Sequence, residues 1–144
     1  MTTKTVDVRS APLAALLLRL LIGALFIAHL YWKFFVFAGG FSGWWAGFAY
    51  NHYPGYVPYY VLSAEIAGAL LIIPGLWARW AALYAVPMMA GAARFWLVRK
   101  GFFFAGGGAE LPMVWCALLV LLALFGDGPY ALKPSPTPWR RRGR

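Results

Sequence analysis

The run from Leu13 to Phe37 reads LAALLLRLLIGALFIAHLYWKFFVF, and its length and apolar character decide the class of protein. A helix rises about 1.5 Å per residue, so this run can cross a hydrocarbon core about 30 Å thick with room for a tilt. Arg19 and Lys33 are its only formally charged side chains. We expect a transmembrane helix, and Lys33 within the run argues against a cleaved signal peptide.

Further apolar runs follow, and each is bounded by residues that end helices. We expect membrane spans at about 13–37, 56–73, 76–98 and 109–125. Pro74 and Gly75 separate the second span from the third, because proline lacks the amide proton and glycine tolerates unusual dihedral angles. Pro87 near the middle of the third span predicts a kink. Residues 39–58, rich in Gly, Trp and Tyr, are expected to form a long interfacial loop.

These runs define an all-α fold with one domain. We expect residues 1–12 to be a polar leader, residues 13–130 an integral membrane four-helix bundle, and residues 131–144 a disordered tail rich in proline and arginine. The chain of 144 residues leaves no room for a second domain.

Composition supports lipid as the main solvent. Hydrophobic residues make up 62% of the chain and charged residues 12%, whereas soluble domains carry about half and a quarter. The net charge of +9 lies mainly at the termini, which favours bilayer orientation over nucleic-acid binding. Cys116 is the only cysteine, so the chain cannot form an internal disulfide. We expect a multi-pass protein of the bacterial plasma membrane.

The distribution of Lys and Arg predicts the orientation. Lys4, Arg9, Arg79 and five basic residues of the tail fall on one side of the expected spans, and Arg99 with Lys100 falls on the other. Cytoplasmic flanks carry the excess of positive charge in membrane proteins. Both termini are therefore expected in the cytoplasm, and the aromatic loop faces outward.

The chain has few polar side chains within its spans, and their depths coincide. Judged from the rise per residue, one layer near the outer face contains His29, Lys33, Glu65, Arg94 and Glu110. Arg19 shares a helix face with His29 and Lys33, but its long side chain can reach the cytoplasmic surface. Charges inside a membrane are costly unless they are paired or face protein or water.

Two interpretations of this layer remain open. In the first, Lys33, Arg94, Glu65 and Glu110 form a buried ion-pair network that fixes helix packing. In the second, they form a polar pocket for an anionic or ring-bearing ligand, with His29 and Glu65 as candidate catalytic residues that handle protons.

Other residues give weaker signals. No second intramembrane histidine completes an axial pair with His29, so haem is disfavoured and no metal site is predicted. The sequence shows no intrinsic cofactor. Trp44 and Trp45 are expected in an interfacial aromatic belt in contact with lipid or a partner. The tail offers further basic contacts for lipid or a partner at Arg140, Arg141, Arg142 and Arg144.

The segment EIAGALLIIPGLWAR at residues 65–79 resembles the DoxX family of small four-helix membrane proteins. In the first span the resemblance includes Arg19, Gly23, Phe26, His29, Lys33 and Phe34. It continues in GGGAE at residues 106–110 and GPY at residues 128–130.

The resemblance implies a four-helix bundle and a link to membrane redox chemistry, because relatives include the DoxD subunit of thiosulfate:quinone oxidoreductase. One hypothesis is therefore a subunit that helps to pass electrons from an outer-face donor, such as a sulfur anion, to quinone. The alternative is a non-catalytic subunit that assembles, anchors or stabilises a larger membrane complex, or that self-associates, through small residues such as Gly23, Gly68 and Gly91. A transporter is disfavoured because no inverted repeat is evident.

Overall fold

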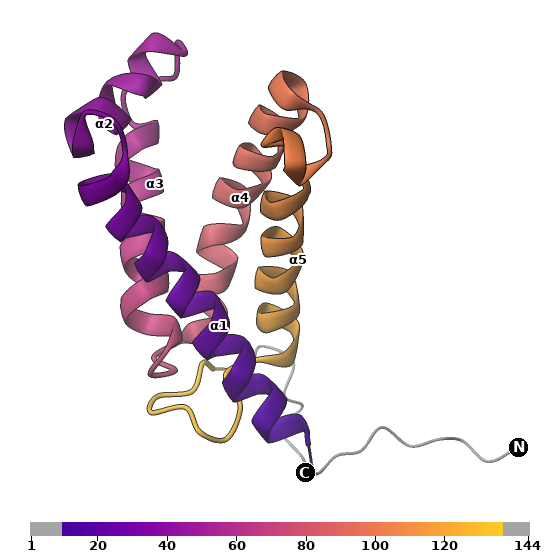
Figure 1. Ribbon diagram of the computed structural model, residues 1–144. Coiled ribbons are helices and arrows are strands. Elements are labelled where there is room, and N and C mark those ends of the chain that lie inside the picture. The colour runs from indigo at the N-terminus through magenta and orange to yellow at the C-terminus, as the bar shows by residue number, and fades with distance from the viewer. Residues whose placement is uncertain (1–9, 137–144) are drawn as a thin grey trace, which may run out of the picture.

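The computed structural model describes residues 10–136, and helices dominate this part of the chain (Figure 1). Two of the helices continue without a break into a wider π-helical turn. The elements are α1 (Ala11–Tyr31) with η1 (Trp32–Val36), α2 (Gly40–Tyr50), α3 (Val57–Ala67) with η2 (Gly68–Ile72), α4 (Ala78–Lys100), η3 (Phe104–Gly106) and α5 (Glu110–Phe125). Residues 10–136 contain no β-strand, only one isolated bridge between Leu76 and Lys133.

The helices begin and end where local chemistry requires it. Pro12 and Pro58 stand in the first turns of α1 and α3, where a missing amide proton has no cost. Gly75 (φ +72°) and Gly126 (φ +80°) adopt left-handed backbone angles just after η2 and α5. Pro87 is exposed within α4, which is one helix from Ala78 to Lys100.

The region expected to be a long loop contains a helix, which corrects the prediction for residues 39–58. α2 forms because Phe41, Trp44, Trp45 and Phe48 recur at helical spacing and their rings contact one another. α2 packs beside η1 and α3. Glycine content hid this helix, since glycine lowers helix propensity.

The long helices meet in an apolar core built from small and branched side chains. α4 contributes a buried face of Ala78, Ala81, Ala82 and Ala85, and it packs most extensively against α5. Methyl groups added at Gly23 and Gly68 would collide with Ile73 and Phe26, whereas one at Gly91 would meet nothing within 4 Å. Gly23 and Gly68 therefore serve contacts within the chain, and Gly91 does not.

The outer surface is apolar over much of the molecule. Large exposed hydrophobic side chains occur on every long helix, for example Leu17, Leu70, Leu83 and Leu124. Among the described residues, two segments are long and apolar enough to cross a membrane: Ala11–Val36 and Ala78–Lys100. Val57–Ile72 and Glu110–Phe125 are shorter apolar helices.

Residues 126–136, which we call the C-terminal strap, close one end of the molecule. Leu132 N donates to Pro74 O (3.0 Å), Lys133 N to Gly75 O (3.1 Å), and Trp77 N to Lys133 O (3.0 Å). Residues 131–136 are thus ordered, contrary to the prediction of a disordered tail, because main-chain hydrogen bonds hold them. Residues 137–144 lie outside the described part.

Different elements gather at the two ends of the molecule (Figure 1). The strap end contains the beginning of α1, the beginning of α4 and the C-terminal strap. The α2 end contains η1, α2 and the connection between α4 and α5. The ribbons of α4 and α5 diverge from those of α1 and α3 toward the α2 end (Figure 1).

Candidate functional site

A buried ion pair links the first two long helical segments near the α2 end. Lys33 Nζ, from η1, donates hydrogen bonds to both carboxylate oxygens of Glu65, from α3. Both side chains are only 4% exposed. Charges in an apolar interior are tolerated when paired in this way, because each compensates the other's lost hydration.

The local backbone explains how the two side chains meet. Lys33 lies within the π-helical turn η1, and the second π-helical turn, η2, starts three residues after Glu65. A π-helical turn inserts an extra residue and so re-aims the side chains around it, and such turns are frequent at functional sites. The spacing of apolar residues alone does not reveal them.

α2 packs against the ion pair through the Trp44 ring. Lys33 Nζ lies 4.9 Å from the centroid of the Trp44 ring, within the range of a cation–π interaction. Trp44 is buried, so it is not part of an exposed aromatic belt. Trp45 remains partly exposed and contacts Tyr59, with 4.7 Å between ring centroids.

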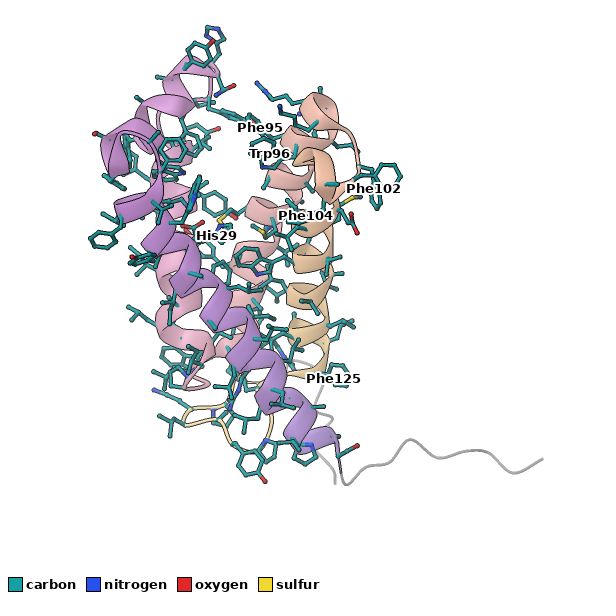
Figure 2. The ribbon with its side chains drawn as sticks, in the orientation of Figure 1. His29, Phe95, Trp96, Phe102, Phe104 and Phe125 are labelled. Carbon is teal, nitrogen blue, oxygen red and sulfur yellow. The ribbon has the colours of Figure 1, made fainter. Side chains whose placement is uncertain are left out.

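His29 lies one helical turn before Lys33 and points toward the inside of the molecule (Figure 2). Its ring meets Trp115 of α5 edge-on, with 4.6 Å between centroids. Trp115 is 2% exposed, and its Nε1 has no hydrogen-bond partner within residues 10–136. A buried donor without an acceptor is costly, so this indole is a candidate ligand contact. Trp115 cannot be recognised as a site residue from the sequence, since one tryptophan in an apolar run carries no distinguishing signal.

The expected single polar layer does not form. Arg94 is exposed and lines a groove between α4 and α5, away from Lys33 and Glu65. Glu110 accepts a hydrogen bond from Phe104 N (2.9 Å) in the first turn of α5, where the helix dipole favours a carboxylate. Depth along a helix gives no information about rotation around its axis, and rotation separates these residues from the ion pair.

A second polar cluster lies at the strap end. Arg19 is 1% exposed, so it does not reach out to the surface as expected. Its Nη2 donates to the main-chain carbonyl of Tyr130 (3.1 Å), whereas Nε and Nη1 have no hydrogen-bond partner within the described residues. Gly75 lies directly against this guanidinium group, since a methyl group there would overlap Nη1. The guanidinium of Arg19 therefore lies between Gly75, in the turn before α4, and Tyr130 of the C-terminal strap.

Asp127 organises the rest of this cluster. One carboxylate oxygen accepts a hydrogen bond from the Arg79 main-chain amide (2.8 Å), in the first turn of α4. The other accepts one from the Ser135 amide. Asp127 and the Arg79 side chain are both buried. The role of Asp127 is not evident from the sequence, because the Arg79 amide lies 48 residues away along the chain.

The remaining residues singled out from the sequence are the metal-ligand types, Cys116 and the basic residues of the tail. Within the described residues, no group of three His, Cys, Asp or Glu side chains could hold a metal ion. Cys116 is partly buried, with Sγ 3.9 Å from the Val86 carbonyl oxygen. The basic residues of the tail lie outside the described part: Arg140, Arg141, Arg142 and Arg144.

Comparison with known proteins identifies the chain's relatives at the level of the family. A family model described as DoxX matches residues 14–100, well over half of the 144-residue chain. The match runs from α1 through α4 and includes Lys33 and Glu65, whereas Trp115 and Asp127 lie beyond it. No curated protein and no solved structure matches the chain. The family match, which covers the greater part of the sequence, shows that this chain belongs to the DoxX family.

Proposed function

We propose that this DoxX protein is a multi-pass protein of the bacterial plasma membrane, with four crossing helical segments and both termini in the cytoplasm. Two long apolar helices and the family support membrane residence. The two shorter apolar helices have 16 residues each, about 24 Å of helix, and carry exposed apolar side chains such as Leu70 and Leu124. Lys4, Arg9 and the basic tail support a cytoplasmic strap end.

Within that membrane, we propose a subunit of an oxidoreductase system that helps electrons pass from an outer-face donor to quinone. The observation that carries this proposal is the unpartnered Trp115 Nε1, buried beside His29, which itself lies four residues before Lys33 of the ion pair. A quinone head bears carbonyl acceptors, which suit a buried indole donor. DoxX proteins are often associated with oxidoreductases, which agrees with this chemistry.

Each residue of the site has a defined task in this proposal. When bound, quinone would supply the electron acceptor: its reduction to quinol takes up two protons and two electrons, and the sulfur-anion donor of our proposal is oxidised by two electrons. Trp115 Nε1 holds a carbonyl oxygen, and His29 orients the ring and exchanges protons. Glu65, held by Lys33, is the second proton-handling group. The electrons reach the site through a partner subunit.

The test is quinone retention by the purified chain. Trp115→Phe removes the indole donor, which has no partner within the described residues, and so should leave the helical content unchanged. Trp80→Phe, at an exposed position on α4, is the matched control. We expect quinone in solvent extracts of the wild type and the control, and about tenfold less in Trp115→Phe. Equal retention in both variants, or no quinone in the wild type, would overturn the redox site.

A second candidate function is assembly or anchoring of a larger membrane complex. The supporting observation is that both Glu65 oxygens are already taken by Lys33, so the pair fixes α1 against α3 without a ligand. Under this proposal, stoichiometric partner proteins co-purify without quinone. The combined variant Lys33→Met with Glu65→Met then keeps those partners, whereas the redox proposal predicts that it loses quinone.

A further inference from the structure

An open groove runs between α4 and α5 on the outer surface of the molecule. Its volume is about 680 Å³, within the range of about 300–1,000 Å³ typical of ligand sites. Small side chains form much of it, and the longer ones are exposed. The residues used below are Ala90, Arg94, Leu97, Met113, Ala117 and Leu121.

The groove is apolar apart from one formal charge. Arg94 is the charged residue among those that line it, and its guanidinium has no ion pair or hydrogen bond within the described residues. Arg99, near the end of the same helix, donates to the neutral side chain of Asn51 (2.7 Å) and stacks on Phe95. Neither contact cancels its charge. This end of α4 is thus positively charged beside an apolar channel.

The dimensions of the groove correspond to one leaflet of a bilayer. From Met113 to Leu121 along α5 the groove extends about 12 Å, and half of a hydrocarbon core is about 15 Å thick. Arg94 lies about 9 Å from the end of α4 at Lys100, a depth from which a long side chain can reach the headgroup region. The cation therefore lies toward the headgroup end of an acyl-chain-sized channel.

We propose that this groove is a binding site for an anionic phospholipid, with the phosphate at Arg94 and one acyl chain along Ala90 and Ala117. A guanidinium pairs well with phosphate, since charged donors form short and strong hydrogen bonds to its oxygens. The charge complementarity selects an anionic lipid over a zwitterionic one, whose headgroup supplies its own cation. The site is separate from Trp115 and His29, so it does not depend on quinone binding.

The test measures lipid retention by the full chain. Native mass spectrometry of protein exchanged into detergent with equal amounts of dioleoylphosphatidylglycerol and dioleoylphosphatidylcholine reports which lipid stays bound. We expect the wild type to prefer the anionic lipid and Arg94→Gln to lose that preference by about tenfold. Arg99→Gln, which removes the same charge from the same helix outside the groove, is the matched control and should behave as the wild type.

A second variant tests the groove itself without changing charge. Ala117→Phe fills the channel and should reduce retention of both lipids, while quinone content and helical circular dichroism stay unchanged. Equal retention of both lipids by the wild type, or equal losses in Arg94→Gln and Arg99→Gln, would overturn the proposal. So would a change from dimer to monomer in Ala117→Phe, which would make the groove an interface between copies of this chain.

Discussion

The polar clusters at the α2 end and the strap end bury charge by different means. At the α2 end, one cation faces one carboxylate, and side chains supply all the contacts of the Lys33–Glu65 pair. At the strap end, the Arg19 guanidinium donates to the Tyr130 carbonyl, and the Asp127 carboxylate accepts from the main-chain amides of Arg79 and Ser135. Main-chain groups therefore take part in each of these hydrogen bonds. In the first cluster, the two side-chain charges neutralise each other. In the second, the hydrogen bonds form only while the C-terminal strap is in place.

This difference indicates which of the two clusters can be replaced by apolar side chains. A pair made only of side chains can be exchanged for apolar residues of similar size, because no other group loses its partner. A cluster that uses main-chain amides and carbonyls cannot, since these groups would remain buried after the exchange. The chemistry of a ligand site is also easier to place on the first cluster, which the fold can lose without unfolding.

The largest expected effect comes from breaking the ion pair one partner at a time. Glu65→Met leaves the Lys33 ammonium buried without compensation, and we expect a loss of about 3–5 kcal/mol in the free energy of unfolding. The combined variant Lys33→Met with Glu65→Met should return to within about 1 kcal/mol of the wild type. Equilibrium unfolding in mixed detergent micelles measures both, and a double variant as unstable as the single one would contradict the comparison.

At the strap end, Asp127→Asn should lower the free energy of unfolding by less than Glu65→Met does. It should also open the C-terminal strap locally. The asparagine amide would turn a donor toward either the Arg79 or the Ser135 amide, so we expect a loss of about 2 kcal/mol. The same substitution should release the strap before the rest of the molecule unfolds. Hydrogen exchange at the Leu132 and Lys133 amides measures that release, which Glu65→Met should not produce. Unchanged protection of those amides in Asp127→Asn would contradict a strap held by this carboxylate.

The close helix contact between the two clusters provides the third test. Gly68→Ala forces a methyl group into the Phe26 ring, and overpacking of this kind costs about 1–3 kcal/mol. Gly91→Ala is the matched control, because its methyl group meets no atom within 4 Å and alanine favours a helix by up to about 1 kcal/mol. The midpoints of thermal unfolding should therefore shift in opposite directions. Equal shifts would contradict a tight contact of Gly68 with Phe26 that Gly91 lacks.

The positions of the helices were accessible from sequence because their causes are local. Long apolar runs, Pro74 with Gly75, and the glycine after Phe125 each act within a few residues. α2 was missed because its glycines lower local propensity, while ring contacts and packing on η1 stabilise it. Tertiary contacts of this kind override propensity and cannot be read from composition.

The candidate site was accessible only in part, for a geometric reason. The positions of Lys33 and Glu65 along their helices predict one common depth, and the structure brings the two side chains into contact. Arg94 and Glu110 have a similar predicted depth, but rotation about their helix axes directs them elsewhere. The pairing of Asp127 with the Arg79 amide depends on the strap's path, which no periodicity encodes.

The smallest expected effects come from the aromatic rings that cover one lysine at each end. Trp44 lies 4.9 Å from buried Lys33, and Trp77, which is 43% exposed, lies 4.4 Å from Lys133. A cation–π contact is stronger where water is excluded, so Trp44→Phe should cost about 1 kcal/mol and Trp77→Phe less than about 0.5 kcal/mol. Double-mutant cycles with Lys33→Met and Lys133→Met isolate each coupling free energy from the loss of ring contact area. A larger coupling at Trp77 would mean that the Glu65 carboxylate satisfies Lys33 so fully that α2 serves only to exclude water from the pair.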